Sequence, residues 1–334
     1  MRKILVSRFS ALGDVTIAVH VLKAVLEQNK DIEILLLTNP FLIQLFKNIK
    51  RISFVNVDLK EKHTGIKGIK LLAKEITSEY EIDAFVDIHN VLRTKLLKTF
   101  LPSKIKTSTI NKGRIEKKKA TKKKNKKLKK LTHSAERYAQ TFIKAGINVD
   151  LNNYESDFEH SASPELEKFK EKFQEKKIAI APFAAHKTKM LPIEIMQEII
   201  KKIPSDYSVF IFGGGKSENQ IAEKWQSEFK NIYSMIGKFS MTDEISMIDS
   251  CDYTITMDSG NMHLASLTKT KIISVWGATH PYLGFSPFKK ENTIYLQKDL
   301  ACRPCSVFGN KKCFRDKMYC LDFDADEIID KIKS

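Results

Sequence analysis

The order of apolar runs along this chain constrains its fold more than any other feature. Short apolar runs typical of buried strands alternate with longer segments of helical periodicity. In the first half, the strand-like runs lie at 3–9, 31–38, 52–58 and 82–89. The alternation restarts at 177–183 and continues to 271–277. Strands separated by helices favour parallel sheets covered on both faces, so we expect an α/β protein.

The two series of strands indicate two domains, which suits a chain of 334 residues. We expect two Rossmann-like, doubly wound units that face a central cleft, with ligands outside the carboxyl ends of the strands. The N-terminal domain is expected at 1–160 and the C-terminal domain at 175–322. A polar helix is expected at 164–176, near the junction, and a last short helix at 323–334.

Positive charge is concentrated in one segment. Between Lys112 and Lys130 there are 12 Lys or Arg and one acid, a net +11 of the chain's +17. Such a run is usually a solvated, mobile loop, and we expect a basic loop at 112–130 within the N-terminal domain. The charge also suits an anionic membrane surface or nucleic acid. Because the segment lacks interleaved aromatic side chains for base stacking, nucleic acid is the weaker alternative.

The sequence shows no apolar stretch close to the roughly 18 to 20 residues that cross a bilayer. Arg8 and Asp14 interrupt the first apolar run, so it does not resemble a signal peptide, and we expect a cytoplasmic protein.

The five cysteines do not form the dense pattern of a disulfide scaffold. Cys251 stands alone. The other four are Cys302, Cys305, Cys313 and Cys320. A CxxC followed by two more cysteines is compatible with a tetrathiolate zinc site, although the second pair is not CxxC. Reduced, buried thiols are the alternative in a cytosolic protein.

Turns between strands and helices hold the candidate binding residues. In "SALGDV", residues 10–15, Gly13 and Asp14 follow the first strand, and Asp14 suits either a helix cap or the base of an active site. In "GGGKSE", residues 213–218, backbone N–H groups of a glycine turn can approach an anion, but a plain tight turn explains the motif equally well.

Two further turns lie in the second half. In "MDSGNMHLAS", residues 257–266, the N–H groups at a helix start stand beside Asp258 and His263. A capped helix with a buried histidine is the alternative. In "FAAHKTKMLP", residues 183–192, Lys189 is either a phosphate ligand or a solvated lysine.

In combination, these motifs resemble the ADP-heptose:lipopolysaccharide heptosyltransferases, glycosyltransferase family 9. The family's order of motifs is matched by "SALGDV", "KMLP" (189–192), "DSGNMHLAS" (258–266) and "VWGATHP" (275–281), and "HSAERY" (133–138) is also similar. The matches span almost the whole chain. Two features depart from the family: the lysine run is far more basic than usual, and Ala184 and Ala185 stand where relatives often carry hydroxyl residues.

The resemblance implies a GT-B fold and an inverting transfer that requires no metal or other cofactor. It places a nucleotide-sugar donor, ADP-heptose, in the C-terminal half and a lipid A–Kdo type acceptor in the N-terminal half. Asp14 is then the general base, and Lys189 stabilises the charge on the departing diphosphate. The residues implied on the donor side are Gly13, Glu218, Asp258, Ser259, Gly260, Asn261, Met262 and His263.

Because several lysines near an anionic leaflet can hold a protein there without a membrane-spanning helix, we also expect a protein that lies peripherally on the inner face of the inner membrane, with no obligate protein partner. The basic residues expected to contact the acceptor and the membrane are Lys117, Lys118, Lys119, Lys122, Lys123 and Lys124.

Other functions stay open at this point. The chain could be a family 9 transferase for a different sugar, or a nucleic-acid-binding protein that uses the lysine run. A nicotinamide-dependent oxidoreductase is disfavoured, because the first turn between strand and helix lacks GxGxxG.

Overall fold

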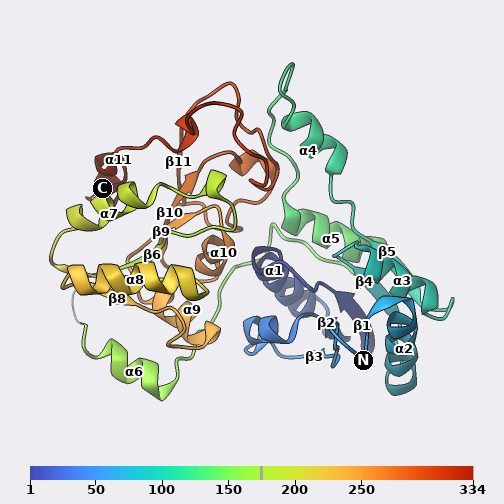
Figure 1. Ribbon diagram of the computed structural model, residues 1–334. Helices are drawn as coiled ribbons and strands as arrows, with labels where there is room; N and C mark the ends of the chain where they lie inside the picture. The colour runs from blue at the N-terminus through green and yellow to red at the C-terminus, as the bar shows by residue number, and fades with distance from the viewer. Residues whose placement is uncertain (174–175, 334) are drawn as a thin grey trace. The chain divides into compact units, whose positions relative to one another are not determined.

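The computed structural model describes residues 1–173 and 176–333 and divides them into two compact units (Figure 1). The first unit is Met1–Gly113 with Thr132–Glu155, and the second is Arg114–Leu131 with Ser156–Ser334. Each unit contains one parallel sheet with helices on both faces, so the expected α/β architecture of two doubly wound units is confirmed.

The first sheet has the strand order β3-β2-β1-β4-β5. Its strands are β1 (Arg2–Ser7), β2 (Ile32–Leu37), β3 (Ile52–Phe54), β4 (Ala84–Asp87) and β5 (Lys106–Thr109). The helices of this unit are α1 (Leu12–Gln28), η1 (Pro40–Phe46, a 3-10 helix), α2 (Gly65–Glu79), α3 (Leu92–Phe100) and α5 (Ser134–Lys144). The chain order reverses direction at β1, which lies between β2 and β4.

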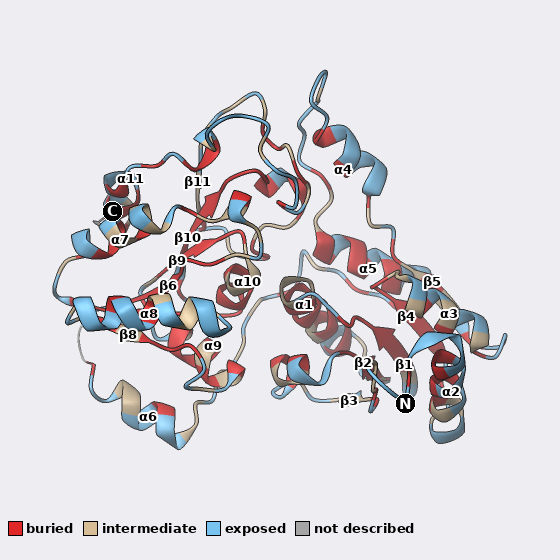
Figure 2. Ribbon diagram, viewed as in Figure 1, coloured by how far each residue is buried: buried red, intermediate tan, exposed pale blue. Residues whose placement is uncertain are grey.

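Alternate side chains of the first sheet pack against different helices. Leu5, Leu35 and Phe85 belong to a cluster with the buried faces of α2 and α3. Helices α1 and α5 contact each other and cover the opposite face (Figure 1). Figure 2 shows that β1, β2, β4 and α1 are largely buried, which explains why their sequences are mostly apolar.

The second sheet has the order β11-β10-β9-β6-β7-β8. Its strands are β6 (Lys176–Ala181), β7 (Tyr207–Ile211), β8 (Ile232–Ser234), β9 (Tyr253–Met257), β10 (Lys271–Trp276) and β11 (Ile294–Gln297). The helices are α4 (Arg114–Ala120), α6 (Pro164–Lys170), η2 (Lys187–Lys189), α7 (Ile193–Lys202), α8 (Lys216–Glu228), α9 (Met241–Asp249), α10 (Gly260–Ser266), η3 (Pro281–Leu283), η4 (Tyr319–Leu321) and α11 (Ala325–Lys333). Here the order reverses at β6, between β9 and β7.

One face of the second sheet packs on α7, α8 and α11 through a cluster that includes Ile180, Ile255 and Trp225. The other face packs on α6, α9 and α10 through Phe210, Met247 and their neighbours. No helix of the described residues has both the length and the apolar character that a membrane crossing requires.

The basic segment differs most from its sequence-based expectation. It was expected as a mobile loop of the N-terminal domain, but 114–131 clusters with the second unit, and 114–120 form the helix α4. Ala120 and Leu131 pack with Leu283 and Phe285, so an apolar anchor at each end attaches the lysines to the fold.

Smaller differences concern element boundaries. The helix expected over 164–176 ends as α6 at Lys170. Residues 174–175 of that expected helix, and Ser334 of the last one, lie outside the described residues. The sequence patterns gave no indication of α3, β5 or β11.

Candidate functional site

Asp14 lies in the first turn of α1, beyond the carboxyl end of β1. Its carboxylate Oδ2 is 2.5 Å from Nη2 of Arg8, and its Oδ1 accepts a hydrogen bond of 3.3 Å from the Tyr138 hydroxyl. The N-cap residue of α1 is Ala11, and no side chain of the described residues caps this helix. The carboxylate therefore serves a side-chain cluster and does not cap the helix.

Arg8 and Tyr138 are fixed by their burial. The Arg8 side chain is 6% exposed, whereas that of Asp14 is 29% exposed, so the carboxylate is supported from the protein interior and open on one side. Arg8 also donates to the carbonyl of Ile88 at 3.0 Å. Burial raises the pKa of the Tyr138 phenol, so this group stays protonated and remains a donor.

A second cluster orders the adjacent end of β4. Oδ1 of buried Asp87 accepts from the hydroxyl of Ser7 at 2.9 Å and from the backbone N–H groups of His89 and Asn90. His89 Nδ1 in turn accepts from the N–H of Phe9 at 3.3 Å. Burial, followed by the nearby charge of Arg8, lowers the pKa of His89 to about 3, so its imidazole is neutral.

In the second unit, the structure brings Lys189 and Asp258 together. Lys189 belongs to η2, after β6, and Asp258 follows β9; these two strands are neighbours where the sheet order reverses. Nζ of Lys189 is 2.9 Å from Oδ2 of Asp258, and both side chains are largely buried. The same Oδ2 accepts a hydrogen bond of 2.6 Å from Thr279. Ligands of doubly wound sheets bind at such a position.

The turn after Asp258 contains a polar group that has no hydrogen-bond partner among the described residues. Ser259 precedes α10, and its buried hydroxyl oxygen has no hydrogen-bond partner among the described residues. Gly260 and Asn261 are partly exposed, while Met262 and His263 are buried. A buried hydroxyl without a partner in a native fold calls for an explanation, and a bound ligand is one.

The other candidates of the sequence lie as follows. Glu218 accepts a hydrogen bond of 2.7 Å from the N–H of Gly214 and so closes the glycine turn before α8. Gly13 lies within the first turn of α1, beside Asp14. Among the basic residues, Lys117 is buried with its Nζ 4.0 Å from the Phe285 ring centre, whereas Lys118, Lys119, Lys122, Lys123 and Lys124 are exposed.

The four clustered cysteines line one small cavity of the second unit, about 20 Å³ in volume, which is about the space of one water molecule. All are free thiols, and burial raises the pKa of Cys320 to about 11. No group of three His, Cys, Asp or Glu side chains among the described residues is arranged to hold a metal ion.

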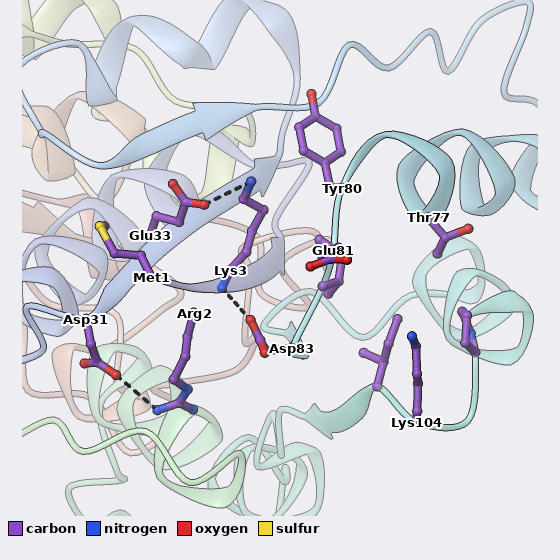
Figure 3. A pocket seen from close by; sticks show the side chains of 13 residues that line it. Met1, Arg2, Lys3, Asp31, Glu33, Thr77, Tyr80, Glu81, Asp83 and Lys104 are labelled. Carbon is purple, nitrogen blue, oxygen red and sulfur yellow. Dashed lines mark hydrogen bonds and ion pairs between the residues drawn. The ribbon is translucent and has the colours of Figure 1, made fainter.

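A groove of about 1050 Å³ lies at the amino ends of the first sheet's strands, the edge opposite to Asp14 (Figure 3). Its charged side chains are largely paired with one another. Lys3 is 2.9 Å from Glu33 through its ammonium and donates its backbone N–H to Asp83, and Arg2 is 3.8 Å from Asp31. None of the candidate residues lies there.

Sequence reasoning selected Asp14, Lys189 and Asp258 but missed Arg8, Tyr138, Asp87, His89 and Thr279. Arg8 and Tyr138 each belong to a motif already singled out, "SRFSALGDV" and "HSAERY", but only the fold shows that the two contact the same carboxylate.

The chain is similar to known proteins over most of its length. The profile of glycosyltransferase family 9 (heptosyltransferase) matches residues 70–313. Lipooligosaccharide heptosyltransferase 2 of Campylobacter jejuni is 30% identical over 133 residues, 38% of this chain and 40% of that protein. That match thus spans about two fifths of the curated relative. Lipopolysaccharide core heptosyltransferase OpsX of Haemophilus influenzae is 22% identical over 308 residues, 90% of this chain and 86% of that protein.

Solved structures share the fold. The glycosyl transferase family 9 protein of Veillonella parvula superimposes with a TM-score of 0.77 at 18% identity, covering 99% of this chain and 96% of that one. ADP-heptose LPS heptosyltransferase II of E. coli gives a TM-score of 0.73 at 13% identity, covering 100% of this chain and 98% of that one. These likenesses confirm the expected GT-B fold.

Proposed function

Because the chain belongs to glycosyltransferase family 9, the heptosyltransferases, we propose that it transfers a heptose from ADP-heptose to an inner-core acceptor of lipopolysaccharide, with inversion at the anomeric carbon. The observation that carries this proposal is the carboxylate of Asp14. It is held by Arg8 and Tyr138, it is open on one side, and it does not cap its helix.

In the proposed reaction, Asp14 accepts the proton of an acceptor hydroxyl while the oxygen of that hydroxyl attacks the anomeric carbon. The bond from the anomeric carbon to the diphosphate oxygen breaks, and ADP leaves with the electron pair. Arg8 and Tyr138 hold the carboxylate in one orientation, so the base is preorganised for proton transfer from the acceptor hydroxyl.

The donor site is proposed around Lys189. Negative charge grows on the departing diphosphate, and a positioned cation lowers the energy of that state. Lys189 is held by Asp258, which Thr279 holds in turn, and the free hydroxyl of Ser259 is a further donor for a phosphate oxygen. The ammonium of Lys189 is the cation in this proposal, which includes no metal. The remaining proposed donor contacts are Gly13, Glu218, Gly260, Asn261, Met262 and His263.

The proposed acceptor is of the lipid A–Kdo type, which carries phosphates and carboxylates. The proposal therefore includes a cytoplasmic protein at the inner face of the inner membrane, with the basic segment 114–131 close to anionic lipid. Its exposed lysines carry the matching charge, and each Lys or Arg near such a surface contributes about 1 kcal/mol.

The decisive experiment incubates the purified protein with ADP-heptose and a deacylated lipid A–Kdo acceptor in the presence of EDTA, and measures release of ADP and heptosylated product. Asp14→Asn should lower turnover by roughly 10²-fold or more, because the general base is lost. Asp31→Asn is the matched control, since Asp31 is exposed at the opposite edge of the sheet and should leave turnover unchanged. Turnover near the wild-type rate in folded Asp14→Asn would remove Asp14 from the mechanism.

A further inference from the structure

Two segments far apart in the sequence form one surface of the second unit. The basic segment, 114–131, contacts the cysteine segment, 302–319, at several points. Nζ of Lys126 donates to the carbonyls of Cys302, at 2.6 Å, and Pro304, at 3.0 Å. Nζ of Lys123 lies 5.2 Å from the ring centre of Phe314.

The residues around η3 complete this surface. The N–H of Leu131 donates to the carbonyl of Tyr282 at 2.9 Å. The ring of Phe285 lies under the ammonium of Lys117 and 5.8 Å from the ring of Phe308. The basic segment is thus attached at its start, middle and end to residues more than 150 positions away.

The surface is strongly cationic. Its exposed cations come from both segments: Arg114, Lys118, Lys119, Lys122, Lys123, Lys124, Lys127, Lys129, Lys130, Lys311, Lys312, Arg315 and Lys317. Its acids are Glu116 and Asp316. The cysteine segment therefore adds charge of the same sign to a segment that is already basic, which raises the field that the surface presents to an anionic partner.

Large apolar side chains are exposed among these cations. Phe308 and Phe314 are each 57% exposed, Ile115 is 73% exposed, and Tyr282 and Leu128 are also in part open. Figure 2 shows α4, which carries Ile115, exposed along much of its length. A single exposed apolar residue needs no explanation, but several among lysines on one surface are typical of proteins that lie in the membrane interface.

We propose that this surface docks onto an anionic lipid bilayer, with the lysines facing the headgroups and Phe308, Phe314 and Ile115 entering the interface. The inference rests on the proposed function in one respect, since a lipid-bound acceptor gives the docking its purpose. A nucleic-acid partner fits less well, because Ile115 and Leu128 offer aliphatic surface that suits acyl chains but does not stack with bases.

The proposed docking surface also lies close to the proposed donor site of the same unit. The cysteine segment is tied to the turn that carries Lys189: the N–H of Cys305 donates to the carbonyl of Ala278, the N–H of Ala278 donates to that of Thr188, and the Thr188 hydroxyl donates to the carbonyl of Gly309. The lipid-facing segment and the Lys189 turn are therefore one packed body.

The first test uses the full chain and vesicles of phosphatidylcholine, with or without phosphatidylglycerol. Both tryptophans, Trp225 and Trp276, are buried, so a new one can serve as a local reporter. The emission of Phe314→Trp should shift to the blue and be quenched by brominated lipid when anionic vesicles are added. The control is Phe41→Trp, which replaces a ring that is 62% exposed in the first unit and should show neither effect.

Co-sedimentation with the same vesicles separates the contribution of the lysine charges to binding from that of the inserted phenylalanine rings. Replacing Lys127, Lys129 and Lys130 by Gln should weaken binding and flatten its dependence on salt. Phe308→Ser with Phe314→Ser should weaken binding by roughly tenfold while leaving the salt dependence intact. Three exposed lysines elsewhere on the second unit, replaced as Lys201→Gln, Lys224→Gln and Lys230→Gln, are the matched control for charge.

Two outcomes would overturn the proposal: vesicle binding indifferent to the Phe308 and Phe314 substitutions, or tight binding of single-stranded nucleic acid at physiological salt without vesicle binding. The proposed function is tested separately, because the Phe308→Ser, Phe314→Ser variant should turn over the deacylated acceptor at the wild-type rate. Absence of turnover in the wild-type protein, with vesicle binding as expected, would contradict the transferase proposal and leave the docking surface standing.

Discussion

At the scale of single residues, the Tyr138 hydroxyl offers the finest test of the Asp14 cluster. Tyr138→Phe removes one neutral donor at 3.3 Å from Asp14 and keeps the buried ring that packs in the first unit. A hydrogen bond of this kind contributes about 1 kcal/mol. We expect turnover to fall by roughly fivefold with little change in the KM for the donor, measured as initial rates of ADP release.

The thermal midpoint of Tyr138→Phe should stay close to that of the wild type, which separates a positioning role from a structural one. A variant with unchanged turnover would show that Arg8 alone orients Asp14. A variant that loses donor affinity instead would place Tyr138 in a different role.

At the scale of elements, the cysteine segment packs on the turn that carries Lys189. Gly309 has φ +78°, and a Cβ there would lie 2.5 Å from Cγ and Cδ of Lys189. Gly309→Ala should therefore cost about 1 kcal/mol of backbone strain and also displace the lysine stem from Asp258. We expect weaker binding of ADP in calorimetry together with slower turnover.

Gly237→Ala provides the matched control. Gly237 has φ +71°, and a Cβ there would meet no described atom within 4 Å, so this variant carries the strain without the collision. If both variants lose stability equally and neither loses ADP affinity, the cysteine segment does not position Lys189.

Local patterns predicted the elements whose own side chains form the core. The strands at 2–7, 32–37 and 84–87 coincide with the apolar runs expected at 3–9, 31–38 and 82–89. Strand β5 was missed because its sequence, "KTST", is polar, and the strand is recognisable only from its pairing with β4. Helix α4 was missed because like charges along one helix are unfavourable. Lys117 and Ala120 of this helix pack near Phe285 and Leu283, contacts between distant residues that no local pattern reveals.

In the candidate site, too, local patterns predicted some features, whereas others depend on tertiary contacts. Asp14, Lys189 and Asp258 could be selected because they occupy turns between strands and helices, where doubly wound folds bind ligands. The contacts between these side chains could not be predicted, because they join residues that are adjacent only after folding. They are the ion pair of Lys189 with Asp258 and the contacts of Arg8 and Tyr138 with Asp14. Tertiary contacts of this kind leave no periodicity in a single sequence.

At the scale of the whole molecule, each unit carries a buried neutral histidine that makes its stability depend on pH. Nδ1 of His89, in the first unit, accepts from the N–H of Phe9 at 3.3 Å, and Nδ1 of His280, in the second, accepts from that of Tyr282 at 3.1 Å. Burial is the main cause that lowers the pKa of His89 to about 3 and that of His280 to about 4, from the ordinary value of 6.5. Protonation of Nδ1 would also break the hydrogen bond that each accepts.

The direction of this pH dependence follows from the protons that the chain takes up on unfolding. Between the lowered pKa values and 6.5, the unfolded chain binds more protons than the folded one, so the stability that these histidines contribute is complete above about pH 6.5 and is lost as the pH falls toward 4 and 3. At pH 5 we expect each unit to lose about 1 to 2 kcal/mol, measured by urea unfolding across this range. His89→Gln, whose side-chain carbonyl can still accept from Phe9, should flatten the pH dependence of the first unit while the second keeps its own. A first unit whose acid sensitivity is unchanged in His89→Gln would mean that other groups bind the protons.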